Sequence, residues 1–367
     1  MQCPRCLNED PRYFYLGSKG YYCRKCIGFK RVLLNESLDS PVQEMREELL
    51  DADYQLSFEL TPKQKEISDK LAIMIEKNSV LVYAACGSGK TEIVMQSIRK
   101  YLKQGLTVGY ATPRRQVVIE IGKRMTEAFS KLKVAIVCEG FTEDVMGDLI
   151  ICTTHQLYRY HQYFDLLILD EPDAFPYYGN DVLKGIVKTS CRKNIIYLTA
   201  TPDHELSQLY TLKLFKRPHG KDLPVPIVKC LPKSVAYIKL LLWLNDHKRA
   251  LIFVPTIKMA KRLSYFLKVP NIHSQTLDKD DIIANFRNRH FPYLICTTIL
   301  ERGVTFSEID VCIVNADHHV FSVASLIQIM GRIGRDINYP YGDGLMLCFR
   351  KSKKAQECIK QIEMMNA

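Results

Sequence analysis

The sequence contains no run of apolar residues that approaches the roughly 18 needed to cross a membrane as a helix. Its first residues, MQCPRCLNED, lack the basic and then apolar pattern of a secretory signal, and no segment is of low complexity. These absences disfavour a membrane-spanning or secreted protein. We therefore expect the chain to fold and act in the cytoplasm, where thiols stay reduced.

Acidic residues are fewer than basic ones: Asp and Glu number 40, Lys and Arg number 51, and the formal net charge is +11. A basic surplus favours polyanionic partners, either nucleic acid or an anionic membrane surface. A basic surface without such a partner is the alternative that charge alone leaves open. With 367 residues, 47% of them hydrophobic, the chain is long enough for two or three domains with their own cores.

Disulfides are not expected in such a chain, although it has 13 cysteines. Nine of them are scattered, several inside apolar runs such as ICTT, DVCIV and LMLCF, and are expected to be small buried hydrophobic residues. The other four form two CxxC pairs, Cys3 with Cys6 and Cys23 with Cys26. Four thiolates at this spacing suit tetrahedral Zn²⁺, and a redox pair is the less favoured alternative. The metal would supply folding energy to a small module at residues 1–35.

The rest of this module interleaves aromatic side chains with Arg and Lys, a mixture that can stack bases and hold phosphates. The same aromatic residues can instead pack the interior of a small zinc fold, and both interpretations stay open. Residues 36–57 then carry seven acids and one base, Arg46, and are expected to form a solvated acidic linker with a short helix after Pro41. An acidic strip that inhibits a DNA site is the less favoured alternative.

From Phe58 onward, helical and strand-like patterns alternate. Short apolar segments such as SVLVYAA, LLILDE and RALIFVPT are separated by segments of helical period. This rhythm predicts an α/β fold in which parallel sheets are covered by helices. The rhythm breaks where prolines gather between Pro218 and Pro232, so we divide this part of the chain into lobes at residues 58–217 and 218–367.

A glycine-rich turn follows the first strand of this region and precedes a helix, which is the context of a phosphate-binding loop. The segment AACGSGKT departs from the strict pattern in having Ala84 where glycine is usual. In such a loop, backbone N–H groups surround the phosphates, the lysine reaches the β- and γ-phosphates, and the hydroxyl binds Mg²⁺. The residues predicted to bind ATP here are Ala85, Cys86, Gly87, Ser88, Gly89, Lys90 and Thr91.

The companion motif is DEPD, which ends the apolar run LLIL. Asp170 is expected to complete the Mg²⁺ shell, and Glu171 to orient and polarise the attacking water. Asp173 is expected to couple the γ-phosphate side to the other lobe, together with the hydroxyls of Thr199 and Thr201. A plain strand capped by acids is disfavoured, because the phosphate loop lies upstream in the expected order.

Two further segments supply candidates. Gln64, in FELTPKQ, can read the adenine edge through its amide, although an ordinary exposed glutamine is the alternative. QIMGRIGR supplies Gln328, Arg332 and Arg335 as catalytic residues. A helix would place Arg332 and Arg335 on one face, where they can act as arginine fingers on a γ-phosphate. A solvated basic face is the alternative.

The order of these segments resembles that of the second helicase superfamily. FELTPKQ, AACGSGKTE, ATPRRQVV, TTHQLYRY, DEPD, TATP, TTILERGVTF and QIMGRIGR follow one another in the chain. DEPDAFP together with TTILERGVTF and an N-terminal four-cysteine module resembles the ComFA family, the late-competence ATPases of Gram-positive DNA uptake. The resemblance covers nearly the whole chain. Pro172 departs from the small apolar residue more frequent in the family, and a strand end tolerates it.

The resemblance implies two RecA-like lobes that close on ATP, preceded by a zinc-ribbon-like module. It implies that single-stranded DNA runs across both lobes, driven by hydrolysis, and that Gly303 contacts the nucleotide. Hydroxyls and main-chain amides suit sequence-independent phosphate contact, although threonine often only packs. By motif match, the residues that line the strand are Thr112, Pro113, Arg114, Thr153, Thr154, His155, Thr297 and Thr298.

The cofactors and partners follow from the same resemblance. ATP, Mg²⁺ and Zn²⁺ are the implied cofactors. The implied partners are single-stranded DNA, a phosphoribosyltransferase-like competence protein and a membrane DNA channel, with the chain peripheral to the inner face of the cell membrane. A homo-oligomer is compatible with this arrangement.

The motifs favour a DNA-import ATPase over three other functions. A PriA-like replication-restart helicase has similar motifs, but such chains carry a large N-terminal DNA-binding region and zinc knuckles inside the motor. This chain has neither, because its cysteine knuckles are at the start. An RNA helicase is disfavoured, because ERGVT replaces the usual ARGxD motif. A non-catalytic scaffold is disfavoured, because the residues expected to hydrolyse ATP are all retained.

Overall fold

The computed structural model describes the chain except for residues 43–49 and 301–305. Its contacts divide the chain into two compact units. The first unit comprises Met1–Ala84 and Gly89–Leu214, and the second comprises Ala85–Ser88 and Phe215–Ala367. Within these described ranges, no helix combines the length and the apolar character that crossing a membrane requires.

The first unit begins with a small module that contains the two CxxC pairs. An antiparallel hairpin of β1 (Phe14–Gly17) and β2 (Gly20–Cys23) lies between the 3-10 helices η1 (Pro11–Tyr13) and η2 (Ile27–Phe29). The four cysteines form the core of this module with Phe14 and Val32. The partly buried side chains packed against that core are Phe29, Leu34, Leu38 and Val182.

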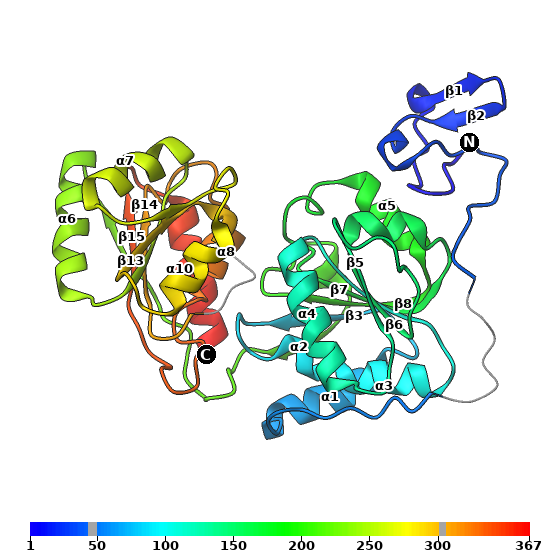
Figure 1. The fold of residues 1–367 in the computed structure, drawn as a ribbon, viewed down its shortest axis with the longest axis horizontal. Helices are drawn as coiled ribbons and strands as arrows, with labels where there is room; N and C mark the ends of the chain where they lie inside the picture. Colours follow the sequence, from blue (N-terminus) through cyan, green and yellow to red (C-terminus); the bar gives the residue numbers. More distant parts are fainter. Residues whose placement is uncertain (43–49, 301–305) are drawn as a thin grey trace. The chain divides into compact units, whose positions relative to one another are not determined.

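This module lies beside helix α5 (Asp181–Ser190) and packs on it (Figure 1). A Cβ atom on Gly185 would lie 2.1 Å from the carbonyl oxygen of Cys6, so the close approach depends on glycine. The hydroxyl of Thr189 donates to the carbonyl oxygen of Arg5 at 2.8 Å. Lys25 also lies 3.8 Å from the carboxylate of Asp181. The module is therefore part of the first unit.

Residues 50–56 form an extended strap on the first unit, which corrects the expectation of a solvated linker through residue 57. In LDADYQL, apolar residues alternate with acidic or polar ones, so an extended chain buries one side and exposes the other. Ala52 is fully buried in the core of the unit, and the apolar residues packed beside it are Leu50, Tyr54 and Leu56.

The outward side of the strap is held by charge. Asp53 lies 2.6 Å from Arg99 and 2.8 Å from Lys103. The backbone N–H of Gln55 donates to the carbonyl oxygen of Ala128 at 2.9 Å. At least one of the acids that indicated a linker, Asp53, therefore forms ion pairs with basic residues of the first unit. The helix expected after Pro41 falls largely on residues outside the described ranges.

Seven parallel strands form the sheet of the first unit, in the order β5-β6-β4-β7-β8-β3-β9. The central β7 is buried along its whole length, and its side chains alternate between two cores, with Leu166 in one and Leu167 in the other. The strands are β3 (Val80–Ala84), β4 (Val108–Thr112), β5 (Val134–Val137), β6 (Leu149–Thr153), β7 (Phe164–Asp170), β8 (Cys191–Thr199) and β9 (Tyr210–Leu214).

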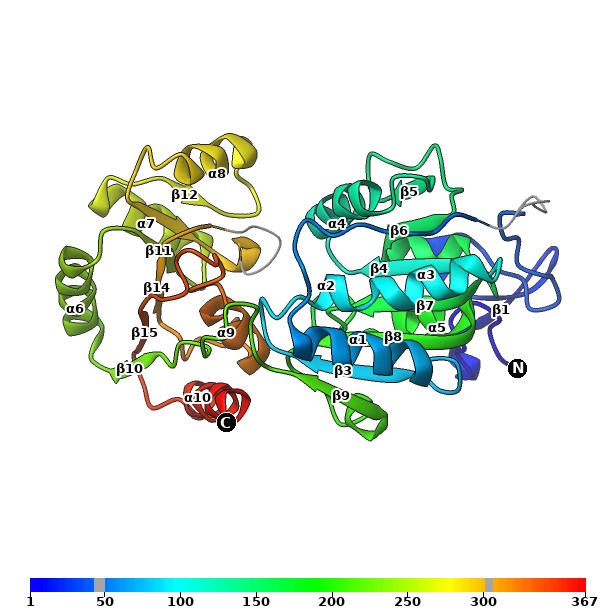
Figure 2. The same ribbon diagram turned by 90° about the horizontal axis from the view of Figure 1, so that it is seen from below.

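Helices cover both faces of this sheet, and Figure 2 shows α1 and α3 lying across one of them. That face is covered by α1 (Pro62–Met74), α2 (Lys90–Ile93), α3 (Met95–Lys103) and α4 (Arg115–Ala128). The other face is covered by α5 and the 3-10 helix η3 (Thr154–Arg159), while η4 (Leu206–Gln208) precedes β9.

The second unit has a sheet of six parallel strands, in the order β10-β15-β14-β11-β13-β12. The strands are β10 (Ile227–Cys230), β11 (Ala250–Phe253), β12 (Asn271–Ile272), β13 (Tyr293–Cys296), β14 (Asp310–Val314) and β15 (Gly344–Cys348).

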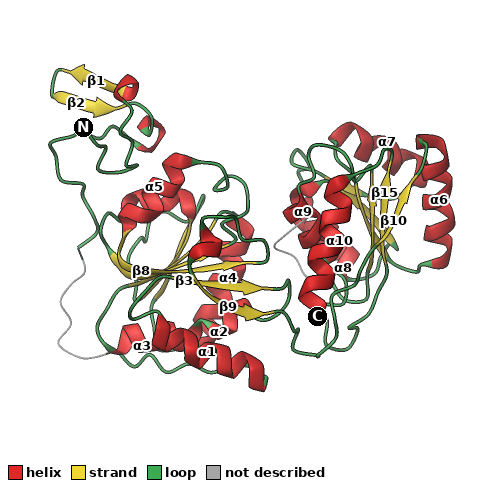
Figure 3. Ribbon diagram, turned by 180° about the vertical axis from the view of Figure 1, so that it is seen from behind, coloured by secondary structure: helices red, strands yellow, loops and turns green. Residues whose placement is uncertain are grey.

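Its helices also lie on both faces. Trp243 and Leu263 belong to the core that α6 and α7 form on one face, and α9 and α10 lie on the other (Figure 3). The helices are α6 (Lys233–Asp246), α7 (Ile257–Leu267), α8 (Lys279–Arg287), α9 (Val323–Met330) and α10 (Lys353–Asn366), with the 3-10 helix η5 (Thr298–Leu300) after β13. The predicted α/β class, with two helix-covered parallel sheets, is confirmed.

Candidate functional site

Adjacent strands of the first unit bring most of its predicted motifs to one edge of the sheet. β3 leads into the phosphate loop, β8 ends at Thr199 and β7 ends at Asp170, and these three strands are neighbours. On the other side of β7, β4 ends at Thr112 and β6 at Thr153. Open parallel sheets bind ligands at this carboxyl edge. The motifs predicted to bind the nucleotide and those predicted to contact DNA therefore lie at the same edge of the sheet.

The phosphate loop adopts a backbone that its glycines permit. Gly87 and Gly89 have φ angles of +79° and +85°, in the left-handed region. A Cβ atom on Gly89 would lie 2.3 Å from Nε2 of Gln64, so a larger residue would displace that amide. Helix α2 begins at Lys90, which is half-exposed, whereas Thr91 is buried.

Gln64 caps the helix that precedes this loop in the chain. Its Oε1 accepts from the backbone N–H of Thr61 at 2.9 Å and from the Thr61 hydroxyl at 3.1 Å. The side chain is 1% exposed, with its amide nitrogen against Gly89. Gln64 thus links α1 to the phosphate loop. Reading of adenine by this amide stays a prediction, and it requires Oε1 to exchange its partners in the cap.

Asp170 is held by a tyrosine that the sequence analysis missed. The hydroxyl of Tyr110, on β4, donates to Oδ2 of Asp170 at 2.9 Å, and both residues are buried. Burial raises the pKa of the Tyr110 phenol well above its ordinary value, and the Asp170 carboxylate adds to the rise. The Thr91 hydroxyl interacts with the same phenol. The two predicted Mg²⁺ ligands, Thr91 and Asp170, therefore both lie beside Tyr110, and their oxygen donors suit that ion.

Glu171 leaves the direction of its strand. It has a φ angle of +58°, a left-handed conformation that costs a non-glycine residue on the order of 1 kcal/mol or more. Its N–H donates to the carbonyl oxygen of Leu198 on β8 at 2.9 Å, which fixes the turn. The side chain is half-exposed, whereas Pro172 beyond it is buried. Such strain at the end of a central strand is typical of a functional constraint.

Asp173 joins the end of β7 to the end of β8. Its Oδ1 accepts from the hydroxyl of Thr199 at 2.6 Å, and its Oδ2 accepts from the hydroxyl of Thr201 at 2.9 Å. The backbone N–H of Thr201 donates in turn to the Thr199 hydroxyl at 2.9 Å. The structure thus brings together the three residues that were predicted to couple nucleotide state to motion.

A second buried acid was also missed. Glu92, one residue after Thr91, is 4% exposed and accepts a hydrogen bond from the guanidinium of Arg124 on α4. Burial lowers the pKa of Arg124, while the charge of Asp170 acts in the opposite sense. The acid that follows GKT was visible in the sequence, but its partner lies 32 residues away.

The residues of the first unit that are predicted to contact single-stranded DNA differ in exposure. Thr112 and Thr154 are fully buried, and among the described residues their hydroxyl oxygens have no hydrogen-bond partner. Thr153 and Pro113 are buried as well, whereas Arg114 is half-exposed and His155 is exposed. Among the predicted DNA-contact residues of the first unit, Arg114 and His155 therefore have the accessible side chains. The contact by buried hydroxyls stays a prediction that would need local movement.

The second unit corrects the expectation of a helical arginine face. Helix α9 ends at Met330, because Gly331 and Gly334 follow, and Gly334 has a φ angle of +63°. Arg332 is 1% exposed, whereas Arg335 is half-exposed and donates from Nε to the carbonyl oxygen of Gly331 at 2.9 Å. The two arginines therefore do not share a helix face.

Other predicted residues of this unit lie in helix α9 and after strand β13. Gln328 is buried and accepts from the thiol of Cys86 at 3.0 Å. Thr297 and Thr298, after β13, are half-exposed. Gly303 lies outside the described residues.

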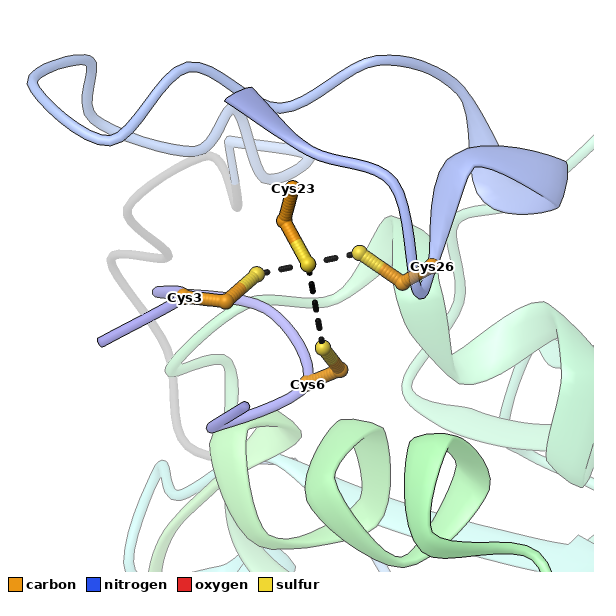
Figure 4. A group of neighbouring side chains, drawn as sticks. All are labelled: Cys3, Cys6, Cys23 and Cys26. Carbon is orange, nitrogen blue, oxygen red and sulfur yellow. Dashed lines mark hydrogen bonds between the residues drawn. The ribbon is translucent and has the colours of Figure 1, made fainter. Parts of the chain in front are cut away.

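The four cysteines of the N-terminal module surround one point (Figure 4). Their Sγ atoms all lie within 4.8 Å of one another, and all four residues are buried. Cys3 and Cys26 are 3.7 Å apart at Sγ, and Cys6 and Cys23 are 3.8 Å apart. A tetrahedral zinc ion with Zn–S bonds of about 2.3 Å has sulfur–sulfur edges of about 3.8 Å. A disulfide needs about 2.05 Å, so the group fits a metal rather than a disulfide.

Family models match both units. Residues 61–209 match the model described as DEAD/DEAH box helicase, and residues 233–336 match the model described as helicase conserved C-terminal domain. Among solved structures, S. cerevisiae Dbp5 bound to RNA and ADP BeF3 is similar with a TM-score of 0.62 and 19% identity, over 84% of this chain and 92% of that one. This likeness concerns the fold, which has tandem RecA-like domains.

Relatives are similar over nearly the full chain. Competence protein ComFA of Streptococcus pneumoniae is 36% identical over 397 aligned positions, which cover 99% of this chain and 90% of that protein. Competence protein ComFA of Bacillus subtilis is 32% identical over 407 aligned positions, which cover 100% of this chain and 85% of that protein.

Proposed function

Since the chain belongs to the ComFA family of competence proteins and is an ATP-hydrolysing helicase, we propose that it uses ATP to move along single-stranded DNA during the import of transforming DNA. The N-terminal four-cysteine group, the phosphate loop and the acids after β7 occur in one chain, as the resemblance in sequence predicts.

The residues at the carboxyl edge of the first unit have the chemistry that hydrolysis needs. Lys90 is assigned to the β- and γ-phosphates, Thr91 and Asp170 to Mg²⁺, and Glu171 to the attacking water. When bound, Mg²⁺ neutralises charge on the phosphates. Tyr110 fixes one oxygen of Asp170, so the carboxylate is oriented before any ion arrives.

The observation that carries the proposal of a motor is the set of hydrogen bonds around Asp173. This carboxylate follows the proposed water-orienting residue by two positions and binds both threonines at the end of β8. A change in the turn at Glu171, on nucleotide binding or loss, therefore acts directly on the segment that holds Thr199 and Thr201. Such a link between the site of hydrolysis and a neighbouring segment is what a motor requires and a simple ATPase does not.

The proposed strand path uses the accessible groups of both units. In the first unit these are Arg114, His155 and the backbone beside them, and in the second they are Thr297 and Thr298. Contacts of this kind recognise phosphates and not bases. The net charge of +11 favours such binding.

We assign one Zn²⁺ to Cys3, Cys6, Cys23 and Cys26. We give it a structural role, because four cysteine ligands would fill its tetrahedral coordination and leave no open position for a substrate or water. We also extend the proposal to the partners that the family resemblance implies. The chain would work at the inner face of the membrane, beside a DNA channel and a phosphoribosyltransferase-like competence protein. Co-purification of these proteins from competent cells tests this part.

The ATPase rate measured with single-stranded DNA, duplex DNA and RNA in one buffer tests the proposed substrate. Single-stranded DNA should stimulate hydrolysis most, since a duplex must be melted first and the 2′-OH of RNA changes the contacts available. Stimulation by RNA equal to or above that by single-stranded DNA would instead indicate an RNA-remodelling enzyme. No response to any polymer would contradict a nucleic-acid motor.

A further inference from the structure

The hairpin of the N-terminal module has two chemically different faces. Phe14 pairs with Cys23 across the strands, and both belong to the module core. The next pair along, Tyr15 with Tyr22, must point to the opposite face, because side chains alternate along a strand. Their ring centroids lie 6.5 Å apart, and Tyr15 is 44% exposed.

An arginine guanidinium lies over the ring of each tyrosine on this outer face. The guanidinium of Arg24 lies 4.3 Å from the ring centroid of Tyr15, and that of Arg31 lies 4.7 Å from the ring centroid of Tyr22. We call these four residues the Tyr–Arg platform. A third pair, Lys25 over Tyr13 at 5.5 Å, lies on the same module.

The platform is not needed to pack the module. The core consists of the cysteines, Phe14 and Val32, with four partly buried apolar side chains against it, and no tyrosine is among them. For Tyr15 and Tyr22, this observation favours a binding role over the packing role that Phe14 has. An exposed Tyr15 ring and a partly exposed Tyr22 ring, each with a guanidinium group over it, point to a ligand that offers both π faces and negative charge.

The charge of the module selects the class of ligand. Residues 1–35 contain seven bases and two acids, and one of the acids, Asp10, pairs with Arg12 at 2.6 Å. The surplus remains positive after a zinc ion and four thiolates are counted. A polyanion with stackable rings is a single-stranded nucleic acid.

The position of the module on the first unit brings it close to the residues proposed to contact DNA. The ring of Phe29 stacks on that of His155, with centroids 5.9 Å apart, and also meets Tyr158 at 5.7 Å. The guanidinium of Arg5 lies 5.7 Å from the Tyr158 ring centroid. These contacts join the module to the segment Thr154–Arg159, at which the proposed strand contact in the first unit is located.

We propose that the Tyr–Arg platform binds single-stranded DNA, so that the zinc module extends the strand site of the first unit. Bases would stack on Tyr15 and Tyr22, while Arg24 and Arg31 would contact phosphates. This inference rests on the proposed function, because it adds a contact for the same polymer.

The test compares full-length variants for binding of a fluorescent oligothymidine by anisotropy. Tyr15→Ala with Tyr22→Ala should weaken binding at least about fivefold, which corresponds to the loss of one stacked base. Tyr21→Ala is the matched control, because Tyr21 is 46% exposed, adjoins Tyr22 and points to the other face. It should bind like the wild type. Zinc content measured in every variant verifies that the module remains folded.

A second pair of variants separates charge from stacking. Arg24→Gln with Arg31→Gln should lower the slope of log affinity against log salt by about 1.4, or about 0.7 for each phosphate contact. If the wild type does not bind the oligomer, the proposed function itself fails. If the wild type binds and both double variants bind equally well with zinc retained, the platform is not a DNA site. Loss of a protein partner together with unchanged DNA affinity would overturn the proposal in favour of a protein-docking face.

Discussion

Asp173 connects two strand ends through its two carboxylate oxygens. Because Oδ1 and Oδ2 each serve a different threonine, neither threonine can move without disturbing the other. The Thr199 hydroxyl also accepts the N–H of Thr201, which closes the ring of contacts. A side chain too short to reach both hydroxyls, such as Ala, would leave them to find other partners, and the two turns would move independently.

Replacement of Asp173 should therefore uncouple hydrolysis from the polymer. In Asp173→Ala, the ratio of the ATPase rate with saturating single-stranded DNA to the rate without it should fall about tenfold. Asp173→Asn should lose less, because one acceptor oxygen remains and threonine hydroxyls can accept from an amide. The ratio is measured in a steady-state assay. An unchanged ratio in the alanine variant would assign coupling to other residues.

Glu171→Gln should still bind ATP and DNA but should hydrolyse ATP about 10²- to 10⁴-fold more slowly. The amide can orient a water but cannot accept its proton. Nucleotide binding by fluorescence and turnover by phosphate release are measured side by side. Lys90→Ala is the contrasting variant, since it should lose nucleotide affinity. Near wild-type turnover in the glutamine variant would place the water-orienting role elsewhere.

The sequence predicted the reacting groups better than the residues that hold them. Lys90, Thr91 and Asp170 follow from fixed spacing within short motifs at strand ends. Tyr110 and Arg124 could not be predicted, because their acidic partners are 60 and 32 residues away and no local pattern relates them. A buried phenol on a strand signals only that some acceptor exists.

The strap formed by residues 50–56 shows how an element can be hidden by its charge. The alternation in LDADYQL is a strand-like signal, but seven acids in the surrounding region suggested a solvated linker. In the structure, Asp53 pairs with two basic residues of α3, which holds the segment on the first unit. Local composition cannot reveal such pairing. The end of α9 was equally hard to place, although its two glycines were visible in QIMGRIGR.

Ala52→Asp should destabilise the first unit by about 3 kcal/mol, because it places an unpaired charge in an apolar core. Gln55→Asp, three residues further along the strap, is the matched control, since Gln55 is exposed and its backbone contact is retained. It should change stability by less than about 0.5 kcal/mol. Urea unfolding curves measure both. Equal stability of the two variants would show that the strap does not contribute to the fold.

Cys23→Ser should abolish the single zinc ion measured by elemental analysis, because three thiolates hold the metal poorly. Limited proteolysis should then cleave within residues 1–40 and leave a stable fragment that contains both sheets. The melting temperature should also fall, since α5 loses the surface that packs against Gly185. Retention of one zinc per chain in the variant would refute the four-cysteine assignment.

At the scale of the whole molecule, the proposal assigns a catalytic role to Arg335 of the second unit. Arg335→Ala should lower kcat about 10³-fold while nucleotide affinity in the absence of DNA is largely kept, because a transition-state contact is not needed for ground-state binding. Arg335→Lys should also fail, since it lacks the planar fork. Turnover and nucleotide affinity are measured separately. An equal loss of both would make Arg335 a ground-state ligand.

The packing of the N-terminal module on α5 has a consequence for synthesis of the chain. The hydroxyl of Thr189 and the carbonyl of Arg5, which bond in the folded unit, are 184 residues apart in the order of translation. At roughly 5 to 20 residues per second, the ribosome reaches α5 about ten to forty seconds after it makes the module. The four thiols are therefore synthesised well before the surface of α5 on which their module packs. If the four thiols bind zinc as proposed, zinc supplied during synthesis should raise the yield of folded protein.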